Sequence, residues 1–156
     1  MQKLIMYTNV IMKPSEITEN LNEFLIETIR NNRQYLNSSE NGCVAKVNKI
    51  LNHTNIISPV TSNIHYTVKI EVERLLPKQG LKLEVEVKMI LETGILCQSH
   101  DIKFWIPENK TGGYKFESGR YTKDDSELLQ GDIVQVQILE IRYEKKIFSC
   151  IALLTT

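Results

Sequence analysis

Two stretches of strict alternation between apolar and polar residues constrain this chain most. Apolar positions in the first are Tyr66, Val68, Ile70 and Val72, and in the second they are Leu81, Leu83, Val85, Val87 and Met89. A period of two indicates a β-strand with one buried face, because successive side chains point to opposite sides. Pro77 and Gly80 lie between the stretches, and together these residue types mark a break. We therefore expect two domains, residues 1–76 and residues 77–156.

The first domain is predicted to be a small α/β unit. Residues 4–12 are β-prone and largely apolar, and Pro14 then ends the strand because proline cannot donate to a ladder. A helix should follow from Pro14 or Ser15, with an apolar face made of Ile17, Leu21, Phe24, Leu25, Thr28 and Ile29. After Gly42, residues 43–50 form a second predicted strand, residues 52–62 a loop, and residues 66–72 a third strand.

The second domain is predicted to contain five short strands. They cover residues 81–89, 95–98, 102–106, 134–141 and 147–154, with a hairpin turn at Gly94 and a long loop at residues 108–127. The apolar phase slips at Leu139, as a β-bulge would make it. Five strands with a long loop between the third and fourth are typical of an OB-type barrel, which can bind oligonucleotides across one face. The fold class is therefore α+β.

Charge and cysteine usage exclude several classes of function. Lys plus Arg equals Asp plus Glu, 19 against 19, so any contact with RNA must be local. No run reaches the roughly 20 apolar residues that span a bilayer, so we expect no membrane. Cys43, Cys97 and Cys150 are too far apart for a C-x-x-C site and suit reduced, buried thiols in an intracellular protein. We find no catalytic, metal-binding or cofactor motif, and an enzyme is the least favoured class.

One segment mixes basic and aromatic side chains as RNA contacts do. Its candidate residues are Lys110, Tyr114, Lys115, Phe116, Arg120, Tyr121 and Lys123. Basic groups there would meet phosphates while the rings stack on bases. The alternative, which we favour, is that the rings pack on the barrel or on a partner. Residues 142–146 form a second basic segment, for which a solvated turn is the preferred interpretation.

Taken in order, these features resemble the seventh-subunit family of eukaryotic RNA polymerase II and its archaeal counterpart. The resemblance covers nearly the whole chain. It rests on Lys13-Pro14-Ser15, Gly42, the run from Tyr66 through Pro77 and Gly80 to Gly94, Phe104-Trp105-Ile106-Pro107 and Gly131-Asp132-Ile133-Val134-Gln135-Val136. The small poxviral polymerase protein is a more remote likeness, and the richness in Asn, Ile and Lys would suit a large-DNA-virus version. Where the family has glycine, an aromatic residue and glycine, this chain has Val85, Ile95 and His100.

The resemblance implies a non-catalytic stalk subunit of a DNA-dependent RNA polymerase. A truncated RNP-like domain would dock on the core enzyme near its clamp, and an S1-like barrel would lie near nascent single-stranded RNA, bound weakly. Implied partners are the core polymerase subunits and a fourth-subunit-like stalk protein. The location would be the nucleus for a cellular protein, and the cytoplasm or virion for a viral one. A free-standing S1-type RNA-binding protein of translation or RNA turnover is the second hypothesis.

Candidate docking residues in the first domain are Val10, Ile11, Met12, Pro14, Pro59 and Val60. The alternative, that they fill the domain's own core, stays open at this stage. In the barrel, Phe104 and Trp105 are neighbours in one strand and must point to opposite faces. The resemblance favours Trp105 as the outward residue and a possible RNA contact.

Overall fold

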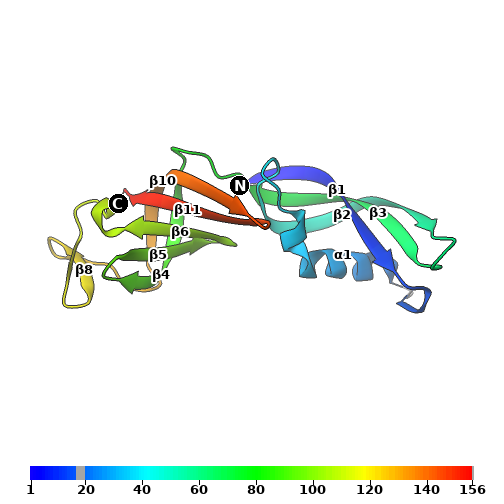
Figure 1. Cartoon of the computed structure of the whole chain (residues 1–156), viewed down its shortest axis with the longest axis horizontal. Coiled ribbons are helices and arrows are strands. Elements are labelled where there is room, and N and C mark those ends of the chain that lie inside the picture. Colours follow the sequence, from blue (N-terminus) through cyan, green and yellow to red (C-terminus); the bar gives the residue numbers. More distant parts are fainter. Residues whose placement is uncertain (17–19, 156) are drawn as a thin grey trace. The chain divides into compact units, whose positions relative to one another are not determined.

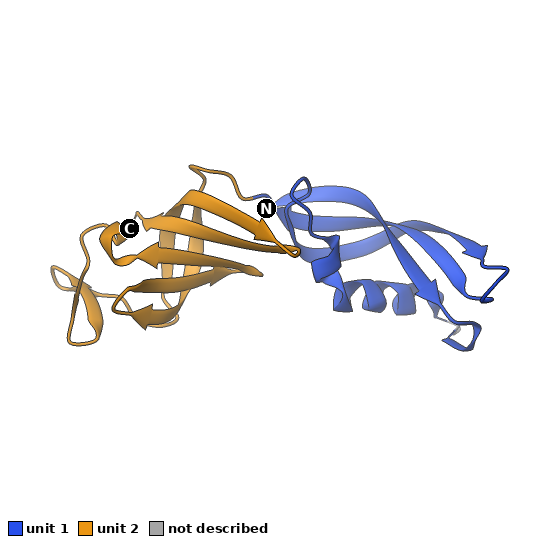
Figure 2. Ribbon diagram, viewed as in Figure 1, with its two compact units in different colours: residues 1–76 blue, residues 77–156 orange. Residues whose placement is uncertain are grey.

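The computed structural model describes residues 1–16 and 20–155. It divides into two compact units, Met1–Leu76 and Pro77–Thr156, which Figure 2 shows in blue and orange. In the described residues, unit 1 is a three-stranded antiparallel sheet with one α-helix, and unit 2 is built around a closed barrel.

Unit 1 follows the expected order of strand, helix, strand and strand (Figure 1). Its elements are β1 (Gln2–Met12), the short 3-10 turn η1 (Pro14–Glu16), α1 (Leu21–Asn31), η2 (Arg33–Leu36), β2 (Cys43–Ile57) and β3 (Ile64–Leu75). The sheet order is β1-β3-β2. Helix α1 begins at Leu21 and not near Pro14, while Ile17 lies outside the described residues.

Strand β2 is longer than its sequence indicates. A loop was expected from residue 52, but Asn52 pairs with Lys69 and the ladder continues to Ile57, opposite Ile64. Residues 52–55 are all polar, so they show no apolar alternation. Pairing with β3, and not burial of their own side chains, holds them in the strand.

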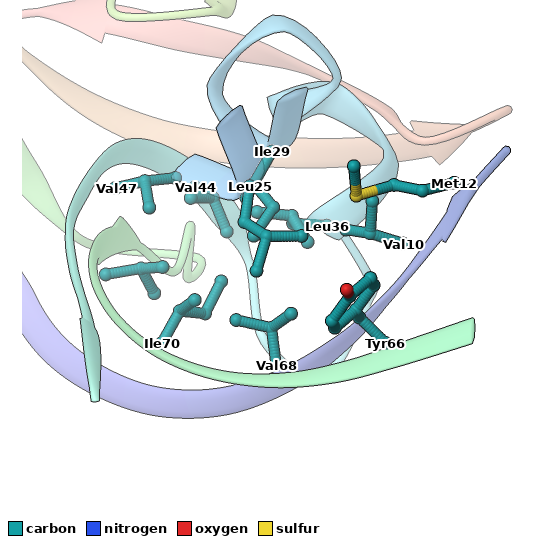
Figure 3. Packing of buried hydrophobic residues seen from close by; sticks show 11 residues of the cluster. Val10, Met12, Leu25, Ile29, Leu36, Val44, Val47, Tyr66, Val68 and Ile70 are labelled. Carbon is teal, nitrogen blue, oxygen red and sulfur yellow. The ribbon is translucent and has the colours of Figure 1, made fainter. Parts of the chain in front are cut away.

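The core of unit 1 lies between α1 and one face of the sheet (Figure 3). Leu25 and Ile29 of the helix pack among side chains of all three strands. The Arg30 guanidinium donates to the carbonyl oxygen of Val47 from Nε at 3.2 Å and Nη2 at 3.0 Å, which ties the helix to β2. The buried Asn37 accepts a hydrogen bond from the N–H of Val44 through Oδ1 at 2.8 Å, so the turn before β2 is also anchored.

Unit 2 contains a closed five-stranded barrel, as expected. Its strands are β4 (Lys82–Leu91), β5 (Gly94–Ser99), β6 (Ile102–Pro107), β10 (Ile133–Glu144) and β11 (Ile147–Leu154), in the order β10-β11-β6-β5-β4. Parallel pairing of β11 with β6 and antiparallel pairing of β10 with β4 close the ring. The predicted bulge is confirmed, because the register between β10 and β11 shifts between Ile138 and Glu140.

The prediction of a long loop at residues 108–127 is wrong. It holds a 3-10 turn, η3 (Glu108–Lys110), and a second small sheet made of β7 (Lys115–Glu117), β8 (Arg120–Lys123) and β9 (Ser126–Glu127). Ser118, Gly119 and Asp124 have φ values of 53°, 80° and 53°, which reverse the chain between these strands. We call residues 115–127 the insertion sheet.

Two turns of the barrel also refine what the sequence predicts. Gly94 is the first residue of β5 and lies opposite Pro107, while the hairpin turn itself is made by Glu92 and Thr93. His100 has a φ of 54°, in the left-handed region that favours glycine.

The barrel interior holds two thiols that should make unit 2 sensitive to alkaline pH. Burial raises the pKa of Cys97 from 9.0 to about 12 and that of Cys150 to about 11. Unfolded thiols ionise near pH 9 while the folded ones stay protonated, so stability is fully present below pH 9 and falls towards pH 11 to 12. Urea unfolding at pH 8 to 10.5 should show this fall, and a smaller one in Cys97→Ala. Equal slopes of unfolding free energy against pH in the wild type and in Cys97→Ala would show that the Cys97 thiol does not cause the fall.

Candidate functional site

The outer surface of the barrel carries a groove of about 410 Å³ across β5, β6, β11 and β10. The ladders place its residues in two adjacent rows. Leu96, Trp105, Ile151 and Glu140 form one row, and Lys103, Ser149 and Arg142 form the next. Three apolar side chains in one row beside two cations in the next suit a single nucleic-acid strand, since bases can stack on the first row and phosphates meet the second.

Trp105 is the aromatic platform of this groove. Phe104 is fully buried inside the barrel, and Trp105, its neighbour in β6, points to the outer surface and is half-buried. The indole lies on the backbone of Gly94, where an added Cβ would come within 2.6 Å of its Cζ2 atom. The absence of a side chain at Gly94 thus lets the ring approach the backbone of β5 closely.

Lys103 and Arg142 supply the positive charge of the groove, on either side of Ser149. The carboxylate of Glu140 lies in the neighbouring row and offsets part of this charge. The groove therefore suits a short segment of backbone with one or two phosphates and not a duplex with many. The chain has a net charge of zero, so any affinity for RNA has to come from a local group of cations such as the one in this groove.

Tyr121 of the insertion sheet is not free to stack on a base. It is 1% exposed, so for this candidate RNA contact the favoured alternative, a ring packed within the protein, holds. Its hydroxyl lies 2.7 Å from the carbonyl oxygen of Leu91 and 3.0 Å from that of Glu92, and its ring lies 5.1 Å from that of Phe116. Burial raises the pKa of Tyr121, helped by Glu108 and Glu92, so the hydroxyl keeps the proton that it donates. Tyr121 anchors the insertion sheet to the β4–β5 turn.

The basic residues of this region are exposed but partly engaged with their own sheet. Lys123 Nζ donates to the carbonyl oxygen of Gly112 at 3.0 Å and lies 5.8 Å from the centre of the Tyr114 ring. Arg120 Nε lies 3.5 Å from the Glu127 carboxylate. Lys110 and Lys115 are exposed on the same region of the chain. The insertion sheet therefore has positive charge at its surface, while the ring of Tyr121 is buried and cannot stack on a base.

Exposed apolar side chains gather at one end of the unit 1 sheet. Ile11 and Ile56 flank His65 in one row across the sheet, and the exposed Ile57 lies in the next row, whose side chains point to the opposite face. Beyond it, in the turn between β2 and β3, Val60 is 90% exposed beside the exposed Pro59. We call these five residues, Ile11, Ile56, Ile57, Pro59 and Val60, the apolar end. Pro14, just after β1, is exposed as well.

Two of the candidate docking residues lie in the core of unit 1. Val10 and Met12 are 6% and 0% exposed and pack in the cluster beneath α1 (Figure 3). The alternative left open for them, that they fill the domain's own core, therefore holds. They alternate along β1 with Ile11, whose side chain points to the opposite face of the sheet.

Sequence reasoning missed Leu96, Lys103, Ser149 and Ile151 in the groove and favoured a solvated turn for Arg142. Each is an outward residue of an alternating strand, which is a signal that the sequence does contain. Their assembly into rows depends on strand register, which the sequence alone did not supply. Ile56 was missed because it falls in the segment interpreted as a loop.

Other kinds of site find no support among the residues described. No group of three or more His, Cys, Asp or Glu side chains within 1–16 and 20–155 is placed to hold a metal ion. The same part of the chain contains no helix with the length and apolar character needed to cross a membrane.

Comparison with known proteins finds matches among solved structures alone. No family model matches the chain, and no curated protein matches it. Among solved structures, the chain is similar to an uncharacterized protein from Methanocaldococcus jannaschii, with 17% identity and a TM-score of 0.36. The match covers 47% of this chain and 89% of the other. A likeness of that extent carries no information on function.

Proposed function

We propose that this chain is a non-catalytic stalk subunit of a multisubunit DNA-dependent RNA polymerase. In this proposal unit 1 is the truncated RNP-like domain that docks on the core enzyme near its clamp. Unit 2 is the S1-like OB barrel that lies near emerging RNA during transcription. The order of a sheet-and-helix unit and a closed barrel supports the proposal, because it is the order that the sequence resemblance implies.

The apolar end of unit 1 is the observation that carries the docking role. Ile56 and Val60 are 75% and 90% exposed, and both lie where β2 ends and its turn to β3 begins. Several exposed apolar side chains at one end of a sheet favour a surface that another protein covers, because their transfer out of water is favourable. Pro59 adds a rigid turn to the same surface.

The barrel groove supports placement beside a single strand of RNA. Trp105, with Lys103 and Arg142 in the next row, combines one stacking surface with two cations. Such a site guides a strand held nearby by the rest of a complex more readily than it captures one from solution, because few phosphates are neutralised. The contact with nascent RNA is therefore weak in this proposal.

Disruption of the apolar end should release the chain from the polymerase. Tagged wild-type chain is expected to co-purify with the two largest polymerase subunits, as seen by mass spectrometry. In Ile56→Asp/Val60→Asp the recovery of those subunits should fall at least about tenfold, since buried unpaired charges weaken an interface by more than the ~1.4 kcal/mol that a tenfold change represents.

The matched control is Leu129→Asp/Ile133→Asp, which places the same charges at exposed apolar positions of unit 2. It should co-purify as the wild type does. A wild-type chain that brings down no large polymerase subunit would refute the stalk proposal. Equal losses in both variants would show that the apolar end has no special role.

The groove also favours a second candidate function, a free-standing S1-type protein that binds single-stranded RNA in translation or RNA turnover. This protein would bind RNA unaided, with an affinity that falls steeply as salt rises. Filter binding of the isolated chain to poly-U at low salt distinguishes the two functions. Tight binding without co-purifying polymerase subunits would favour the free RNA-binding protein.

A further inference from the structure

The two edges of the unit 1 sheet differ in how they are protected against strand pairing. Strand β2, one edge, contains Lys46 and Lys49, and its register against β3 shifts at three places. Lysines and bulges are the usual devices that prevent an edge strand from accepting another strand. Two features thus protect the β2 edge against pairing with another strand.

Strand β1, the other edge, has neither device over most of its length. It pairs with β3 without a register shift through all eleven residues, and Lys3 is its one charged residue. It contains no proline. Every second N–H and C=O of an edge strand points away from its neighbour, so β1 presents a regular row of donors and acceptors. A long, regularly paired edge that carries a single charge is a template for one more strand.

A groove of about 340 Å³ runs beside this edge, between β1 and the end of α1 with η2. Val10, Ile29 and Leu36 are buried core residues that also line it, so its floor is apolar. Thr8, Asn9 and Thr28 give it a polar rim, and Tyr35, 70% exposed, stands at the η2 side. An incoming strand that pairs with β1 would direct alternate side chains to the face of the sheet that carries this groove.

We propose that the outer edge of β1 is a binding site for an extended segment of a partner polypeptide, which adds a fourth strand to the sheet. Main-chain hydrogen bonds to β1 provide the affinity, and an apolar side chain in the groove provides the specificity, as in other cases of strand addition. The occupant is a strand and not a helix, because only an extended backbone matches the row of donors and acceptors along β1. This site lies on other residues than the apolar end, except for Ile11, and does not depend on the polymerase assignment.

A random linear peptide library displayed against the full chain tests the proposal. Enriched peptides should alternate apolar and polar residues, and their binding should slow hydrogen exchange of β1 backbone amides at least about tenfold in mass spectrometry. Hydrogen exchange of the backbone amides in β2, the protected edge, should stay unchanged.

Proline substitution at two neighbouring positions supplies the matched control. Successive N–H groups of β1 point alternately towards β3 and outward, so only one of Thr8→Pro and Asn9→Pro removes a bond within the sheet. That variant should lose stability in urea. Its neighbour should keep most of the wild-type stability and lose peptide binding by about tenfold or more, because proline blocks the outward row.

Three results would overturn the proposal. The first is an absence of enriched peptides. The second is a peptide that leaves β1 exchange unaltered or binds the stable proline variant as tightly as the wild type. The third is slower β1 exchange that depends on the concentration of the chain itself, which would make the occupant a second copy. None of these results bears on co-purification with polymerase subunits, so failure here and failure of the stalk proposal remain distinct.

Discussion

Replacing Gly94 with alanine should lower the free energy of unfolding by roughly 3 kcal/mol, at the upper end of the usual cost of overpacking. The added Cβ would lie 2.4 Å from the carbonyl oxygen of Ile106 and 2.6 Å from the Trp105 ring. The carbonyl belongs to the β5–β6 ladder, so it cannot move without breaking strand pairing. The indole must therefore turn away and leave the groove.

Trp105 is the chain's one tryptophan, so its fluorescence reports this displacement directly. Gly94→Ala should shift the emission to longer wavelength, because the ring becomes more hydrated, and urea unfolding should begin at lower denaturant. Gly119→Ala is the control: its φ of 80° makes alanine strained, yet no atom lies within 4 Å of the added Cβ. Its cost should be about 1 kcal/mol with unchanged emission. Equal stability and equal spectra for the two variants would contradict the packing described for Gly94.

The barrel strands could be predicted because their signal is local. Alternation of Val85 and Val87 with charged residues fixes both the strand and its inward face, without knowledge of any partner strand. The slip of apolar phase at Leu139 predicted the bulge for the same reason, since it breaks the alternation within one strand. Period and phase are properties of a few consecutive residues.

The insertion sheet could not be predicted because its order comes from distant contacts. Few of its residues are apolar, and Tyr121 is buried through hydrogen bonds to carbonyl groups about thirty positions earlier in the chain. A basic and aromatic composition is equally compatible with a ring that stacks on RNA and a ring that anchors a turn. The same limit applies to β2, where residues 52–57 are held by pairing with β3.

The groove was accessible to sequence reasoning only in part. The period of a strand predicts that Phe104 and Trp105 point to opposite faces, but only the burial of Phe104 in the structure identifies Trp105 as the outward residue. The neighbours of Trp105 in the groove cannot be predicted from the sequence. Lys103 and Arg142 lie on either side of Ser149 only because β6 pairs in parallel with β11 and β11 pairs with β10 across a bulge. Sequence reasoning therefore emphasised the contiguous basic segment of residues 110–123, whereas the register assembles the groove from separate strands.

The groove and the insertion sheet are competing RNA sites, and substitution separates them. Trp105→Ala should weaken binding of the full chain to poly-U about tenfold to a hundredfold, since one base–aromatic stack contributes roughly 1–3 kcal/mol. Trp105→Phe keeps a ring on Gly94 and should retain most of the affinity. Urea unfolding of both variants distinguishes a lost contact from a lost fold.

The cations of the groove should be visible in the salt dependence. Arg142→Gln should reduce the slope of log affinity against log salt by about 0.7, the value for one phosphate contact on a single strand. Lys115→Gln removes the same charge from the insertion sheet and should leave the slope unchanged. The opposite pattern would move the RNA path to the insertion sheet. Because the two variants have equal net charge, a general loss of positive field cannot produce a difference between them, and the slope therefore identifies which surface meets the phosphates.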